Sequence, residues 1–203
     1  NYPVQLAAQE RGSTACDLLY AATKEEYTYS PENEPHISLN FTHRLAKVIL
    51  KFVNMEKEPL EVSDVRIEGM QTAASFNIQT DVLTVDESSV ATINPYHNAT
   101  TGFYEAIILP SALTDSYKVS FVLDDREKEW IFTNLDIALP QFHKGYSYTF
   151  ALYIDDSGFV EMGRLENVEG GNSSAPWEDG SSEDGTAEGD KTPVSGYAFT
   201  PAD

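Results

Sequence analysis

The four histidines are the side chains of this sequence best suited to bind a transition metal, because neutral imidazole is a common ligand. They are His36, His43, His97 and His143, and none lies at a recognised ligand spacing from another or from Cys16, the single cysteine. His43 continues a strand pattern at a point where that pattern changes phase. The spacing therefore favours hydrogen bonding to irregular backbone over metal binding at His43, and no metal or other cofactor is expected.

Acidic side chains offer two further kinds of chemistry. Asp124-Asp125 and Asp155-Asp156 could supply calcium ligands, but both pairs fall at predicted hairpin turns and neither extends into a D-x-D-x-D-G loop. Two carboxylates are also enough for a glycoside hydrolase. With 33 acidic residues in the chain, such pairs carry little information, so hydrolysis is only a third alternative.

Motifs for nucleophilic or phosphate chemistry are absent from the sequence. It contains no G-x-S-x-G, G-x-x-x-x-G-K-[ST] or G-x-G-x-x-G. One cysteine also excludes an intrachain disulfide framework and a four-cysteine zinc site. We therefore predict that the protein is not an enzyme.

The charge and the aromatic residues bear on the partners of the protein. A formal net charge of −20 argues against nucleic acid, whose phosphates it would repel. Eleven Tyr and two Trp could stack on sugars. Most of the Tyr alternate in phase with core residues, which favours packing, so a surface glycan-binding module using exposed Tyr and Trp is the alternative function.

Strand and turn patterns follow each other at the spacing of roughly 8–12 residues that is typical of a β-sandwich or barrel. Residues 103–109 are nearly all apolar, which predicts a central strand covered on both faces. Residues 117–123 and 128–133 predict a hairpin, and residues 146–154 form the longest strict alternation. We predict an all-β sandwich of about seven or more antiparallel strands.

Residues 37–53 (ISLNFTHRLAKVILKFV) contain two strand patterns in opposite phase. Ile37, Leu39 and Phe41 alternate with polar residues, which predicts that all three lie on one buried face. After Leu45 the apolar residues occupy even positions. A slip of one residue exchanges the two faces of a strand, so a bulge or corner is expected at residues 43–45.

Composition divides the chain into three parts. Residues 1–35 are a polar lead-in, expected to be a linker or the end of a preceding domain, and residues 36–164 form the sandwich domain. Residues 165–203 are an acidic, Gly/Ser-rich and flexible extension, in which residues 194–200 are either a terminal strand or a disordered end. No stretch approaches the ~20 apolar residues of a membrane helix, so a signal or anchor is expected outside this sequence.

Five short motifs resemble, in order, those of the fimbrillin-like proteins of Bacteroides and its relatives, the subunits of type V pili. Residues 39–48 (LNFTHRLAKV) are similar to the L-x-F-x-H-x-L-A-K-V signature of that family. The other four motifs are DLLYA at 17–21, IILP at 107–110, GYSYTF at 145–150 and PWEDG at 176–180. The motif residues singled out are Phe41, His43, Leu45, Ala46, Lys47, Val48, Pro110, Gly145, Tyr148 and Trp177.

The resemblance implies both a fold and a function. Members are typically lipoproteins with two transthyretin-like, Greek-key sandwich domains, exported to the outer membrane and the cell surface. This chain would then be a structural or adhesive subunit of a fimbrium. Its partners would be other fimbrial subunits, in a homo- or hetero-polymer, with surface glycans or proteins as further partners.

The resemblance also implies an assembly mechanism. In the family, proteolysis after an Arg removes an N-terminal strand, and a neighbouring subunit donates a strand to the open groove, which is β-augmentation. Arg11 is not assigned as the processing site. We expect residues 194–200 to pair with an edge of another copy, and the signature to be a folding feature without a catalytic group.

Overall fold

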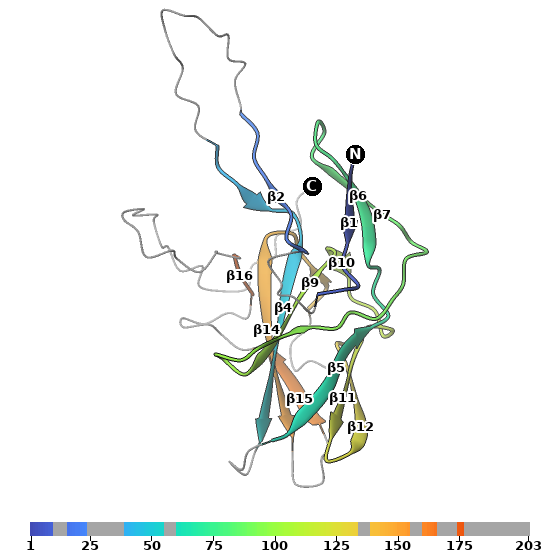
Figure 1. Ribbon diagram of the computed structural model, residues 1–203, viewed down its shortest axis with the longest axis vertical. Coiled ribbons are helices and arrows are strands. Elements are labelled where there is room, and N and C mark those ends of the chain that lie inside the picture. Colours follow the sequence, from blue (N-terminus) through green and yellow to red (C-terminus); the bar gives the residue numbers. More distant parts are fainter. Residues whose placement is uncertain are drawn as a thin grey trace, which may run out of the picture.

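The computed structural model describes residues 1–9, 16–23, 39–54, 60–133, 139–154, 160–165 and 174–176 (Figure 1). Every element named in these ranges is a strand, which confirms the all-β prediction. The strands are β1 (Tyr2–Gln5), β2 (Leu19–Tyr20), β3 (Thr42–His43), β4 (Ala46–Asn54), β5 (Val62–Glu68), β6 (Ala73–Asn77), β7 (Val82–Val85), β8 (Tyr96–Asn98), β9 (Phe103–Ile108), β10 (Ser111–Ala112), β11 (Lys118–Leu123), β12 (Arg126–Ile131), β13 (Gln141–Phe142), β14 (Tyr146–Ile154), β15 (Val160–Leu165) and β16 (Ser174–Pro176).

Two sheets enclose the main hydrophobic core. One is six-stranded, with the order β15-β14-β4-β9-β8 and β16 also paired with β14, and the other has the order β12-β11-β5. The core between them holds Val48 and Phe150 from the larger sheet, and Phe121 and Trp130 from the smaller one. These strands face each other as the two layers of a sandwich (Figure 1).

A third sheet, with the order β1-β6-β7, covers part of the opposite face of the six-stranded sheet. On β9, Ala106 and Ile108 belong to the main core, whereas Ile107 packs in a second cluster with Val4 and Phe76. Successive residues of a strand point to opposite faces. The prediction that residues 103–109 form a strand covered on both faces is therefore confirmed.

The pairing of β4 with β14 is parallel, from Ser147↔Lys47 to Ile154↔Asn54. The other strand pairs are antiparallel, as predicted. The two strands are far apart in sequence, so the connection between them is long enough to bring the chain back in the same direction.

The chain turns a corner between β3 and β4, as the phase shift at residues 43–45 predicted. Leu45 is buried in the second cluster and Ala46 in the main core, so these consecutive side chains pack on opposite faces of the sheet. The prediction that Leu39 and Phe41 are buried is wrong, because they are 48% and 61% exposed. The reason is that β3 is only two residues long, and neither Leu39 nor Phe41 belongs to a core cluster, whereas Tyr20 of its partner β2 packs against the second cluster.

The predicted hairpin is formed by β11 and β12, whose closing pair is Leu123↔Arg126. Asp124 and Asp125 in its two-residue turn have φ values of 48° and 60°, as a type I′ turn requires. The second acidic pair, Asp155-Asp156, lies outside the described residues. Asp124 and Asp125 therefore serve the turn.

Both ends of the described chain pair with the sandwich. In the predicted lead-in, β1 pairs with β6, and Val4 and Leu6 are buried. In the predicted extension, β16 pairs with β14 through Tyr146↔Pro176, and residues 194–200 lie outside the described ranges. The division of the chain at residues 35 and 164 stays a prediction.

Candidate assembly site

The first strand is held to the protein along one edge. β1 pairs with β6 from Tyr2↔Phe76 to Gln5↔Ala73, and no second strand pairs with it in the part of the chain that the structure describes. Leu6 N–H continues the ladder by donating to Thr72 O at 2.8 Å. This bond places Pro3 at a non-hydrogen-bonded position, where its missing N–H costs no contact with β6.

Gln9 extends the contact of this segment to a second strand. Its side chain is 1% exposed. Nε2 donates to Ile107 O at 2.6 Å and to Leu6 O at 2.8 Å, and Oε1 accepts from Ile107 N–H at 2.7 Å. β8 pairs with β9 only as far as Glu105. The amide of Gln9 therefore replaces the peptide group of a neighbouring strand at Ile107.

Apolar side chains beneath β1 form the floor of the site. Val4 is 4% exposed and Leu6 is fully buried. Burying such side chains stabilises a protein by roughly 1.5–3 kcal/mol each. The cluster around them consists of Leu45, Ala74, Phe76, Ile107 and Leu109. We call β1, Gln9 and the surfaces that they cover on β6, Ile107 and this cluster the β1 site.

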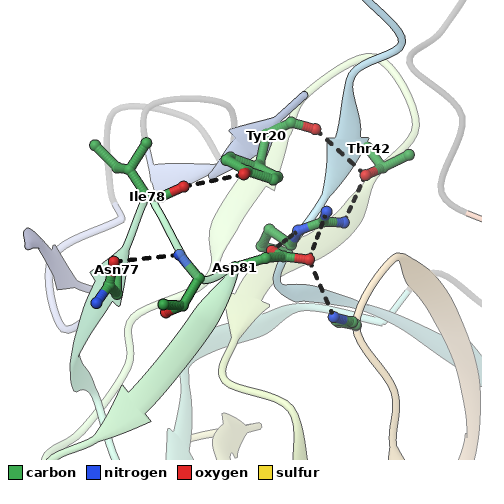
Figure 2. Close-up of polar contacts among 8 residues, drawn as sticks. Tyr20, Thr42, Asn77, Ile78 and Asp81 are labelled. Atoms are coloured by element: carbon green, nitrogen blue, oxygen red, sulfur yellow. Dashed lines mark hydrogen bonds and ion pairs between the residues drawn. The ribbon is translucent and has the colours of Figure 1, made fainter. Parts of the chain in front are cut away.

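The corner at residues 43–45, between β3 and β4, lies beside the β1 site and is tied to the turn between β6 and β7 (Figure 2). Arg44 binds Asp81 through two contacts, Nε to Oδ1 at 2.6 Å and Nη2 to Oδ2 at 3.0 Å. Its guanidinium lies 4.9 Å from the centre of the Tyr20 ring, and the Tyr20 hydroxyl donates to Ile78 O at 2.9 Å. The corner and β6 are thus held together by charge, stacking and hydrogen bonding.

His43 links two of the motifs that suggested the family. Its Nδ1 lies 2.9 Å from Oδ2 of Asp17, and the two side chains are 8% and 9% exposed. Asp17 begins the DLLYA motif, and β2, which follows it, pairs with β3. Among the described residues, no three side chains of His, Cys, Asp or Glu come together in a group that could hold a metal ion.

Five other motif residues support the start of the β4–β14 pair. Ala46 and Val48 are in the main core, and Lys47 Nζ lies 2.7 Å from Glu105 Oε2. Gly145 N–H donates to Leu45 O at 2.8 Å. These contacts join the signature to the beginning of β14.

The four remaining motif residues lie in differing environments. The Tyr148 hydroxyl accepts a hydrogen bond from His143 N–H at 2.7 Å. Burial raises the pKa of Tyr148 to about 12. Pro110 is half-buried after β9, Phe41 is largely exposed, and Trp177 lies outside the described residues.

A comparison with known protein families shows the family to which this chain belongs. The sequence profile described as fimbrillin-like matches residues 1–177. The chain belongs to the fimbrillin-like family. The resemblance to this family is thereby confirmed, and the match includes β1 and Gln9.

A solved structure similar to this fimbrillin-like chain shares its fold. A candidate cell adhesion protein from Bacteroides uniformis aligns with a TM-score of 0.66 and 23% identity, over 77% of this chain and 62% of that one. A second, from Bacteroides ovatus, aligns with a TM-score of 0.49 and 16% identity, over 71% of this chain and 49% of that one. The chain therefore spans less than two thirds of the length of either protein. No curated protein sequence matches it.

Sequence reasoning missed Val4, Leu6 and Gln9. The alternation of Val4 and Leu6 with Gln5 was a usable sign of a strand, although only two apolar positions carried it. Nothing in the sequence indicated that the amide of Gln9 would reach Ile107, which lies 98 positions away.

Proposed function

We propose that this fimbrillin-like chain is a non-enzymatic structural or adhesive subunit of a cell-surface fimbria, joined to other subunits by strand addition at the β1 site. The single observation that carries the proposal is the one-sided attachment of β1 to β6 over a buried apolar floor. A strand in this position can be exchanged for another without breaking any other strand pair.

A donated strand would reproduce the contacts that β1 makes. Main-chain hydrogen bonds to β6 would supply affinity, and alternate apolar side chains in place of Val4 and Leu6 would set the register. The segment that we assign as donor is 194–200 (VSGYAFT), because it combines strand-forming residues with an apolar alternation. It lies outside the described residues.

The family and its relatives support a location at the cell surface. The solved relatives from Bacteroides carry the description of candidate cell adhesion proteins. We place this chain in a fimbrium at the outer membrane, exported as a lipoprotein precursor, with other fimbrial subunits as its partners.

A reversible crosslink between β1 and β6 tests the proposal. Pro3 and Ser75 are paired at a non-hydrogen-bonded position, where Cα atoms are close enough for a disulfide. Pro3→Cys with Ser75→Cys, in a Cys16→Ser background, should block polymer formation in the producing cells under oxidising conditions. Reduction should restore it, as followed by gel electrophoresis and electron microscopy of surface fimbriae.

The matched control places the crosslink in a hairpin that the proposal leaves in place. Val122→Cys with Glu127→Cys joins β11 to β12, also at a non-hydrogen-bonded pair. This variant should polymerise under both conditions. Normal polymers from the oxidised β1–β6 variant would show that β1 stays in place during assembly and would overturn the proposal.

A further inference from the structure

A pocket of about 560 Å³ opens where the end of β4, the start of β5 and the β8–β9 hairpin meet. This volume lies within the range of roughly 300–1,000 Å³ that is typical of small-molecule sites. Its described lining residues are half-buried or exposed, so the pocket is accessible from solvent. It is distinct from the β1 site.

The floor of the pocket is fixed to both sheets of the sandwich. Tyr104 on β9 donates its hydroxyl hydrogen to Val62 O on β5 at 2.9 Å. The ring of Phe52 meets that of Tyr104 edge-on, with centroids 5.7 Å apart, and packs against Phe121 of the main core at 4.8 Å. The floor is therefore preorganised for a ligand.

An exposed histidine, His97, also lines the pocket. His97 stacks on Tyr104 with a centroid distance of 4.6 Å and an interplanar angle of 27°. Because His97 and Tyr104 are paired across β8 and β9, the backbone holds this stack in place. His97 is exposed, so the stack offers aromatic surface to a ligand.

Polar groups surround the aromatic floor. Asn54, Glu61 and Thr101 line the pocket, and their side chains carry an amide, a carboxylate and a hydroxyl group. They combine hydrogen-bond donors and acceptors, as recognition of several hydroxyl groups requires. We infer that this pocket binds a neutral saccharide, whose apolar ring face would stack on His97 while its hydroxyls bond to the polar rim.

The geometry disfavours two other ligand classes. An aromatic cage for an organic cation needs several ring faces directed at one point, but here Tyr104 gives one face to His97 and meets Phe52 at an interplanar angle of 89°. An acidic sugar would be repelled by Glu61 and by the net charge of −20. Glu61 is the one carboxylate among the described lining residues, whereas a glycoside hydrolase needs two, so binding without cleavage is expected.

Isothermal titration of the full chain tests this inference with lactose, maltose, cellobiose and N,N′-diacetylchitobiose. At least one of these disaccharides should bind, and His97→Ala should weaken that binding by about tenfold or more. Tetramethylammonium chloride and 3′-sialyllactose, titrated in parallel, should not bind.

The matched control is His143→Ala. His143 lies next to Tyr146 with ring centroids 5.9 Å apart, at the end of β14 that pairs with the beginning of β4. Its removal should leave affinity unchanged. Failure of all four neutral disaccharides to bind, stronger binding of the cation or the acidic sugar, or equal binding by His97→Ala would each overturn the inference, whatever the outcome of the crosslinking experiment.

Discussion

Gln9 binds the backbone of Ile107 as a neighbouring strand would, through contacts of 2.6 Å to its carbonyl oxygen and 2.7 Å from its N–H. The contact closes an edge of β9 that β8 does not reach. The Gln9 side chain thus ties the end of this segment to the six-stranded sheet by hydrogen bonds, while β1 pairs with β6.

Gln9→Ala should lower the free energy of unfolding by about 1–3 kcal/mol, because Ile107 N–H would then be buried without its partner. Urea denaturation measures the change. Gln5→Ala is the control, since Gln5 lies on β1 but is exposed. Equal stability of Gln9→Ala and Gln5→Ala would mean that water replaces the amide at no cost.

Arg44→Lys should destabilise the protein by about 1 kcal/mol, since Lys cannot make both contacts with Asp81 or stack on Tyr20 as a planar group does. Asp81 has a φ of 55°, and Asn tolerates that conformation. Asp81→Asn therefore removes the charge while keeping the turn, and a double-mutant cycle with Arg44→Lys isolates the pair. Additive effects in thermal denaturation would argue against coupling.

Gly69→Ala should cost considerably more stability than Gly102→Ala. Both glycines have positive φ, at 88° and 74°. In this backbone conformation Ala is less stable than Gly by roughly 1–2 kcal/mol. A Cβ at Gly69 would lie 2.0 Å from Ser116 O, whereas one at Gly102 meets nothing within 4 Å. The backbone clash should add about 1–3 kcal/mol. Equal midpoints in urea would contradict this.

Tyr148→Phe should flatten the dependence of stability on alkaline pH. Burial raises the pKa of Tyr148 from 10.0 to about 12, so the folded protein keeps this proton after the unfolded chain has released it. The stabilising contribution is complete below pH 10 and is lost as the pH rises through about 12, by up to roughly 3 kcal/mol. Unfolding free energies measured from pH 9 to 12 test this, with Tyr2→Phe at an exposed ring as the control.

Periodicity predicted the elements that lie in the sandwich core. The alternation in residues 146–154 corresponds to β14, and the change of phase at His43–Leu45 corresponds to the corner before β4. These predictions succeeded because burial against a sheet imposes a period of two. The burial of Phe41 was predicted wrongly, because the same period cannot show whether a partner surface exists.

The β1 site and the pocket depended on contacts across long sequence distances. Gln9 and Ile107, or Tyr104 and Val62, come together only after the sheets have formed. His97 was weighed as a metal ligand, and its sequence position gave no sign of the stack on Tyr104. Local pattern therefore predicted the strands but not the surfaces that they create.

The parallel alignment of β4 and β14 determines how the domain would respond to mechanical tension. Eight residue pairs join the two strands, from Ser147↔Lys47 to Ile154↔Asn54. Because the strands run the same way, a pull on the chain before β4 and after β14 acts at opposite ends of the pair. The strands would be sheared lengthwise, so that their hydrogen bonds share the load instead of opening one after another.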